Sequence, residues 1–303
     1  MATLPIPSIL GPDLAEVERA IAERLHRRPM VEQIAAPYAQ TSGPRLRAAL
    51  VLLSAQIGNY QLDRTIHAAT AVELIQAASR MHDSLVDPLA RRHDAVSDWP
   101  GMYGNVALMV GDYLFALAAS EMALAPDARI IGYYSRSVMA FCEAALLPTR
   151  TLDPIIARQQ YFDGIGHSSA VLVESACKAG AVCGELTSEQ IDALGRFGYA
   201  LGLALRINDD VLAFQADDSV ALHSGSITLP LIYAAEANPS QGIAFLEQDA
   251  HTIVSEVRRL GGDRLAMAEG YRYAEQAMEH LMALPEVPAR HALAAITEAL
   301  RSS

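Results

Sequence analysis

The chain is 303 residues long, enough for one large domain or two small ones with a substantial buried core. Its formal net charge of −12 excludes non-specific nucleic-acid binding, which requires a basic surface. Hydrophobic residues make up 51% of the chain but aromatic ones only 6%, and Ala and Leu are frequent, which favours helices over strands.

Helices are predicted almost throughout, in one domain that spans residues 1–303. A surface helix is expected over 12–28, where acidic residues precede basic ones. Gly43 and Pro44 interrupt the chain before an apolar helix, and a longer helix covers 66–86, until Pro88, Pro100 and Gly101 indicate a loop. Further helices are predicted over 105–124, 127–147, 153–162, 168–184, 187–214 and from 228 onward, with a polar loop over 216–226. The segment 240–302 is expected to be amphipathic helix with turns at 261–262 and 285–288.

Three features bear on compartment and on bound metals. The chain has no run of about 18 uncharged apolar residues, and its first residues lack the basic and apolar regions of a secretory signal. We therefore expect a cytoplasmic protein with no transmembrane segment. Cys142, Cys177 and Cys183 are odd in number and lack the spacing of a zinc site, so we expect small buried residues, without a disulfide.

Two groups of carboxylates lie on apolar helical segments. Gln76, Arg80, Asp83 and Asp87 have offsets of 0, 4, 7 and 11, which place them on one narrow face of a helix. Two carboxylates one turn apart can reach a single Mg²⁺, which prefers oxygen ligands and bridges to phosphate, although an isolated DxxxD is more often a solvated face.

The second group has Asp209 and Asp210 in the apolar segment GLALRINDDVLAF. Adjacent aspartates are costly there unless a positive group meets them, or unless they mark the solvent end of the helix. Two such groups on separate helices would suit metal-bridged diphosphate chemistry.

Six segments in order resemble the trans-type isoprenyl diphosphate synthases (polyprenyl synthetases): GPRLRAALVLLS, HDSLVD followed by ARR, VALMVGDYLFALA, SSAVLVESACKAGAV, GLALRINDDVLAF and GSITLPLIYAAE. The resemblance runs from about residue 40 to 235. It implies an all-α isoprenoid synthase bundle around a deep central cavity, in which aspartates hold Mg²⁺ against an allylic prenyl diphosphate and isopentenyl diphosphate attacks the resulting cation. It implies the following sites: Asp83, Asp87, Asp209 and Asp210 on the metal, and Arg91, Arg92 and Arg47 on phosphate, with Arg45 in the same segment as Arg47.

The sequence departs from the family at several of these positions. Ser84 and Ala213 replace one aspartate in each motif, and Gln76 replaces a histidine that helps to hold isopentenyl diphosphate. Pro44, Ser168 and Ser226 stand where the family has lysines. Lys178 is the one lysine among 23 basic residues, but a bias toward arginine does not explain Pro and Ser.

Two arginines are new relative to the family, Arg80 and Arg206, and each lies three residues before an aspartate. They could replace the missing lysines as diphosphate ligands. They could instead pair with Asp83 and Asp209, occupy the metal positions and prevent ionisation of the substrate. The third interpretation is two ordinary surface pairs of about 0.2–0.5 kcal/mol each.

The leading hypothesis is therefore a Mg²⁺-dependent prenyltransferase that acts on an allylic prenyl diphosphate. Two alternatives stay open. A terpene synthase-like enzyme would ionise one diphosphate and need no isopentenyl diphosphate. A catalytically weak subunit would modulate an active homologue through the helical dimer interface that the resemblance implies. A homodimer is expected, and a heterodimer is the other option.

Overall fold

The computed structural model describes residues 6–39, 45–86, 103–146, 152–153, 156–215, 227–238 and 249–301, and these form helices and no strand. The elements are η1 (Ser8–Leu10), α1 (Gly11–His26), α2 (Pro29–Ala39), α3 (Leu46–Ala55), α4 (Leu62–Val86), α5 (Tyr103–Leu124), α6 (Arg129–Leu146), α7 (Ala157–Ile165), η3 (Gly166–Ala170), α8 (Val171–Cys183), α9 (Ser188–Gln215), α11 (Leu229–Ala237), α12 (Ala250–Leu260), α13 (Gly262–Leu281) and α14 (Pro288–Ala299).

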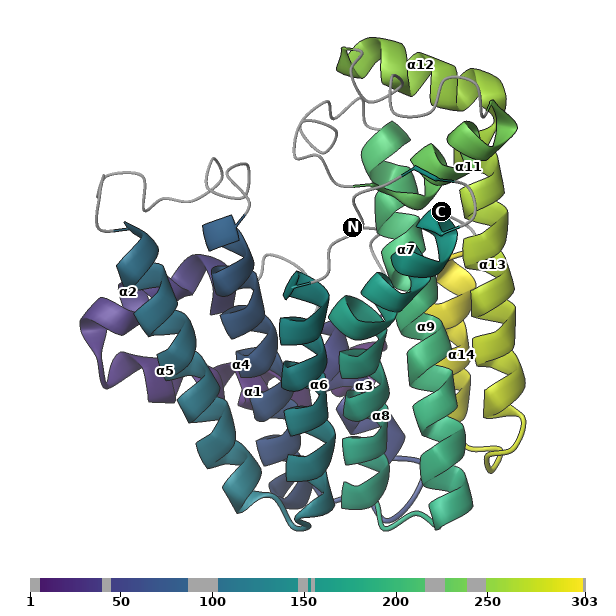
Figure 1. Cartoon of the computed structure of the whole chain (residues 1–303). Helices are drawn as coiled ribbons and strands as arrows, with labels where there is room; N and C mark the ends of the chain where they lie inside the picture. The colour runs from purple at the N-terminus through teal and green to yellow at the C-terminus, as the bar shows by residue number, and fades with distance from the viewer. Residues whose placement is uncertain are drawn as a thin grey trace.

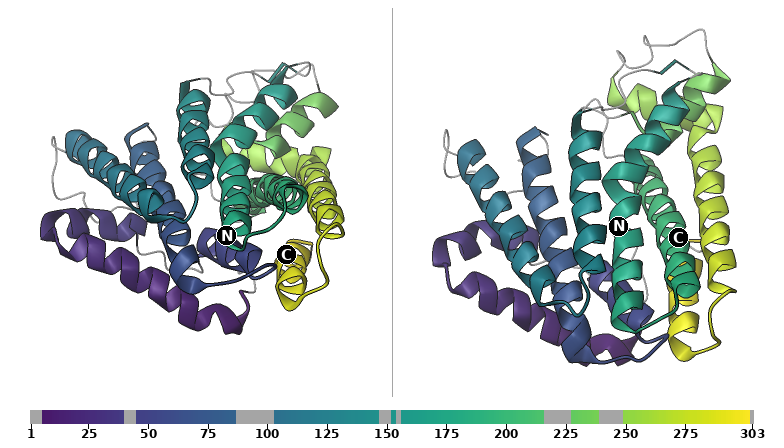
Figure 2. Two further views of the ribbon diagram at one scale, coloured as in Figure 1. Left: turned by 90° about the horizontal axis from the view of Figure 1, so that it is seen from below. Right: turned by 60° about the horizontal axis from the view of Figure 1, so that its bottom comes forward.

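The long helices form a bundle in which α4, α5, α6, α8, α9 and α13 run roughly along one direction (Figure 1). Helices α1 and α2 cross one side of α4 and α5, as the view from below shows (Figure 2). The predicted all-α fold is confirmed in the described part of the chain. The composition explains it, because Ala and Leu combine high helix propensity with tight packing.

The buried side chains form two hydrophobic clusters, and α9 contributes to both. Phe197 and Leu201 belong to the larger cluster, which α3, α4, α8 and α14 also line. Ile207 and Val211 belong to the smaller one, with residues of α7, α11 and α12. Helix α9 therefore contributes side chains to both clusters.

Helix α5 bears on the expectation that the chain has no transmembrane segment. By length and composition alone, Asn105–Leu124 could cross a membrane, with a mean hydropathy of 1.4, and 39% of it is buried. Its Glu121 is buried, however, and accepts hydrogen bonds from Arg24 of α1 at 3.0 Å and from His67 of α4 at 2.9 Å. A carboxylate that is paired from two neighbouring helices is typical of a helix packed inside a bundle.

The predicted first surface helix is confirmed as α1, which ends two residues early at His26, and a separate helix, α2, begins at Pro29, whose ring suits the first turn of a helix. Two details of the prediction were wrong. The segments predicted over 153–162 and 168–184 are joined, because α7 continues through the π-helical η3 into α8. Cys177 and Cys183 are buried as expected, but Cys142 on α6 is exposed.

Candidate functional site

The first charged wall is one face of α4 near its C-terminal end, formed by Gln76, Arg80 and Asp83. Arg80 and Asp83 are exposed and Gln76 is half-buried, whereas Ala78 and Met81 on the other face are fully buried. This burial pattern agrees with the predicted common face. Asp87, the fourth member of the stripe, lies outside the described residues.

The end of α4 is fixed against α5 by His82. Its Nε2 lies 3.2 Å from the carbonyl oxygen of Leu108 and 3.5 Å from Asp112 Oδ1. Gly111 permits this approach, since a Cβ atom at that position would lie 2.2 Å from the imidazole. His82 is therefore a packed histidine, and it holds the backbone that carries Asp83.

The second wall is the corresponding part of α9, with Arg206, Asp209 and Asp210. Asp210 is only 5% exposed, and its carboxylate accepts a hydrogen bond from Tyr161 Oη of α7 at 2.7 Å. Its other oxygen lies 3.2 Å from Arg206 Nε. One of the three interpretations paired Arg206 with Asp209, but its ion-pair partner is Asp210, at i+4. Asp209 is half-buried, and burial raises the pKa of its carboxyl group.

The two walls lie close enough for their charges to interact. The pKa of Arg206 is raised by Asp210 first and also by Asp209 and by Asp83 of the opposite helix. Arg47, at the start of α3, interacts with groups on both walls. Burial lowers its pKa, Glu73 and Asp209 oppose this effect, and Arg80 adds to it. Both α4 and α9 have their C-terminal ends at the upper side of the bundle in Figure 1.

Arg47 and Arg80 are positively charged side chains that lack some of their polar partners among the described residues. Arg47 Nε is buried without a hydrogen-bond partner, and no ion pair joins Arg80 to a carboxylate of the described residues. Like charges so close together are unfavourable unless an anion binds between them. The pair between Arg80 and Asp83 that the second interpretation required is likewise absent from the ion pairs of the described residues.

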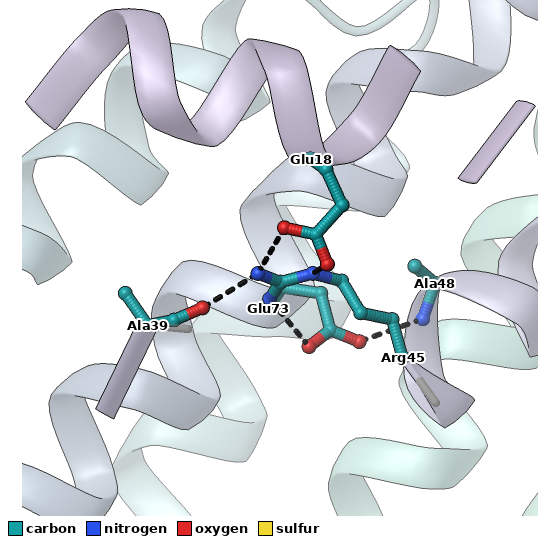
Figure 3. A network of polar contacts seen from close by, with 5 residues as sticks. All are labelled: Glu18, Ala39, Arg45, Ala48 and Glu73. Carbon is teal, nitrogen blue, oxygen red and sulfur yellow. Dashed lines mark hydrogen bonds and ion pairs between the residues drawn. The ribbon is translucent and has the colours of Figure 1, made fainter. Parts of the chain in front are cut away.

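Arg45 lies elsewhere, in a buried ion-pair network at the start of α3 (Figure 3). Its guanidinium is 4% exposed and donates to Glu18 of α1 at 2.6 Å, to Glu73 of α4 at 3.4 Å and to the carbonyl oxygen of Ala39 at 2.6 Å. Glu73 also accepts the backbone N–H of Ala48 at 2.9 Å. The network ties α1 and α4 to the helix that carries Arg47, so these contacts give Arg45 a structural role.

The remaining sequence candidates divide into two groups. Ser168 is exposed within η3, the segment between α7 and α8. Asp87, Arg91, Arg92 and Ser226 lie outside the described residues. The predicted central cavity would also involve residues 87–102 and 216–226, so it stays a prediction.

A groove of about 630 Å³ lies between α7, α8, α9 and α13. Its lining includes Phe162, Lys178, Arg196 and Tyr199 but none of the predicted site residues. Within the described ranges, no three His, Cys, Asp or Glu side chains are grouped as a metal site would require.

Sequence reasoning missed Tyr161 and Glu73, two residues that organise the site. Tyr161 contacts Asp210, 49 positions along the chain, and Glu73 contacts Arg45 across 28. No local spacing could reveal either pair. The one available signal was that a carboxylate in an apolar helix needs a partner.

Comparison with known proteins now adds to this geometry. Residues 28–259 match the sequence model of the family described as Polyprenyl synthetase. The nonaprenyl diphosphate synthase of Mycobacterium tuberculosis is 31% identical over 84% of this chain and 82% of its own. Heptaprenyl diphosphate synthase component 2 of Geobacillus stearothermophilus is 27% identical over 93% of both chains.

Among solved structures, a polyprenyl synthase of Caulobacter crescentus, complexed with calcium and isoprenyl diphosphate, has a TM-score of 0.86. It is 24% identical, and the match covers 100% of this chain and 99% of that one. At this level of identity the likeness establishes the fold, an all-α isoprenoid synthase bundle.

Proposed function

Because the chain belongs to the polyprenyl synthetase family, we propose that it is a prenyltransferase that binds an allylic prenyl diphosphate between the ends of α4 and α9. The observation that carries this proposal is the interaction of charges across the two walls. Arg206 on α9 interacts with Asp83 on α4, and Arg47 interacts with groups on both. Carboxylates and arginines that converge from three helices suit a ligand that combines a diphosphate with a cation.

The side chains present fit a divalent cation, which we propose to be Mg²⁺. Carboxylate oxygens are its preferred ligands, and Asp83 and Asp209 supply them from opposite walls. Burial raises the pKa of Asp209, so its charged form would be favoured by a cation beside it. When bound, the metal would neutralise charge on the leaving diphosphate. Asp87, next to the described part of α4, is the further ligand that we propose from the sequence.

The residues of the chain then have separate roles in the transfer. Arg47 and Arg80 would bind phosphate oxygens, because both are close to the walls and have positive charge without an ion-pair partner among the described residues. The allylic carbon–oxygen bond breaks and its electron pair leaves with the diphosphate. The double bond of isopentenyl diphosphate forms the new carbon–carbon bond, and a proton is lost. The apolar helices around the site would keep water from the cation.

Incubation with farnesyl or geranylgeranyl diphosphate, Mg²⁺ and isopentenyl diphosphate tests the proposal. We expect a longer prenyl diphosphate, formed at least about 100-fold more slowly by Asp83→Asn and Asp209→Asn, which each remove a charge from one wall. Asp192→Asn is the matched control, because Asp192 is exposed on α9 away from the wall. A hydrocarbon or alcohol formed without isopentenyl diphosphate would instead indicate a terpene synthase-like enzyme.

A subunit role is the second candidate, because one relative is named component 2 of a heptaprenyl diphosphate synthase. The missing lysines at Pro44, Ser168 and Ser226 favour the same candidate. Unchanged substrate from the purified chain, with activity restored by a homologous partner, would support it.

We also propose that α5 and α6 form the subunit interface. Six of the twelve large exposed apolar side chains of the described residues lie on these two helices: Leu108, Met109, Leu124, Ile131, Met139 and Leu146. Such a concentration on two neighbouring helices is typical of an interface between chains.

A further inference from the structure

The side chain of Arg206 is held at one end by a buried pair of residues. Its Nε lies 3.2 Å from Asp210 Oδ1, and Asp210 Oδ2 accepts the hydrogen bond from Tyr161 Oη at 2.7 Å. Asp210 and Tyr161 are only 5% and 3% exposed, whereas the Arg206 side chain is 44% exposed. The three residues therefore form a chain of contacts from the core of α7 and α9 to the open side of α9.

This geometry determines which part of Arg206 is available. The ion pair engages the Nε end of the guanidinium, and the terminal nitrogens carry four of its five N–H groups. An arginine that is already held in an ion pair has less freedom to lose when a ligand arrives, so binding costs less entropy. A planar fork of N–H donors matches the oxygens of a phosphate.

The same contacts argue against Arg206 as a substitute for the metal. No ion pair within 4.0 Å joins Arg206 to Asp209 or Asp83 in the described residues, although all three charges interact at longer range. The guanidinium is drawn toward Asp210 on its own helix and does not bridge the two walls. Asp209 on α9 and Asp83 on α4 therefore remain on opposite walls, and the Arg206 guanidinium does not bridge them.

The hydrogen bond from Tyr161 and the ion pair with Arg206 also determine which role Asp210 can have in the site. A carboxylate that is 5% exposed, with a phenol on one oxygen and a guanidinium on the other, has its charge compensated within the protein. It is oriented by α7 as well as by α9. The position of the Asp210 carboxylate relative to the core therefore depends on Tyr161.

We propose that Arg206 is a diphosphate ligand and that Tyr161 and Asp210 are positioning residues that hold it, which assigns Asp210 to Arg206 instead of to the metal. The inference rests on the proposed function, because the diphosphate is that of the prenyl substrate. It supplies positive charge to a site in which Ser168 and Ser226 replace lysines of the family.

Binding of inorganic pyrophosphate to the full chain in EDTA, followed by calorimetry, tests this directly without metal or turnover. We expect Arg206→Gln to weaken binding at least about tenfold, since charge-assisted bonds are lost. Tyr161→Phe and Asp210→Asn should weaken it about three- to tenfold. Arg196→Gln and Tyr199→Phe are matched controls on α9 and should leave affinity unchanged.

A double-mutant cycle separates positioning from a general structural effect. If Tyr161 acts through Arg206, then Tyr161→Phe should add almost nothing in the Arg206→Gln background, whereas independent effects would add. Additive losses would overturn the positioning role. Should Tyr161→Phe unfold the protein, Asp210→Asn provides the same cycle from the other side of the contact.

Two further results would overturn the proposal. One is unchanged pyrophosphate affinity in folded Arg206→Gln; the other is a gain in Mg²⁺ affinity in that variant, which would mean that Arg206 occupies the metal position.

Failure of the proposed function looks different, because pyrophosphate would bind and respond to the variants as expected while no prenyl product formed. The KM for the allylic diphosphate should rise in Tyr161→Phe in the active enzyme.

Discussion

At the scale of single residues, the Arg45 network makes a strong prediction about stability. Arg45→Met keeps the apolar stem but leaves Glu73 with an uncompensated charge at 6% exposure. Loss of one partner from a buried ion pair costs about 3–5 kcal/mol, so we expect the free energy of unfolding to fall by about that amount in urea titrations.

Arg19→Met is the control for this prediction. Arg19 also contacts two glutamates, Glu16 and Glu23, but its side chain is 61% exposed. Exposed pairs contribute little to stability because water and salt screen them, so Arg19→Met should leave the urea midpoint almost unchanged. If Arg45→Met instead kept its stability and lost pyrophosphate affinity, Arg45 would be the phosphate ligand that the sequence suggested.

Periodicity predicted the residues of the first wall but not their partners. The shared face of Gln76, Arg80 and Asp83 follows from helical spacing, which needs no tertiary information. The partner of Arg206 could not be chosen in this way, because i+3 and i+4 are both neighbours on a helix. Burial decides in favour of Asp210, and burial depends on α7, which contributes Tyr161.

At the scale of helices, the close approach of α3 and α8 at Gly180 should not tolerate a side chain. A Cβ atom there would lie 2.1 Å from the carbonyl oxygen of Val51 and 2.8 Å from Ser54 Cβ. Backbone cannot move aside locally, so we expect Gly180→Ala to lower the free energy of unfolding by about 1–3 kcal/mol or more.

Gly132→Ala on α6 is the matched substitution, because a Cβ atom there would meet nothing within 4 Å. It should stabilise the protein by about 0.5–1 kcal/mol through helix propensity. Equal thermal shifts in the two variants would contradict the proposed tight packing of α3 against α8.

The helical character of the segments was predictable from composition and apolar periodicity, whereas some helix boundaries were not. The separate helix α2 follows a break at Arg27 and Arg28, for which Pro29 is the signal in the sequence, because a proline suits the first turn of a new helix. The passage from α7 to α8, which separate helices over 153–162 and 168–184 would leave open, contains Gly164 and Gly166. Gly166 instead permits contact with Tyr199 of α9, since a Cβ atom would lie 2.6 Å from its hydroxyl oxygen, and the helix continues.

At the scale of the whole molecule, the site depends on helices that are distant in sequence. Arg47 of α3 interacts with Asp209 of α9, and Asp83 of α4 interacts with Arg206 of α9, so these interactions need the packed helices of the bundle. The resemblance to polyprenyl synthetases predicted this convergence, because it transfers a known arrangement of helices. The residue pattern by itself predicted two acidic stripes and left their relative positions open.

The apolar surface of α5 and α6 leads to a prediction about assembly. Met109 is 66% exposed and Met139 is 56% exposed on adjacent helices, so a charge at both should prevent another chain from burying them. We expect the wild type to sediment as a dimer and Met109→Glu with Met139→Glu as a monomer that keeps its helical circular dichroism spectrum. Met282→Glu, at a position that is 74% exposed after α13, should leave the dimer intact. A monomeric wild type at micromolar concentration, or a dimer that survives the double substitution, would rule out this face as the interface.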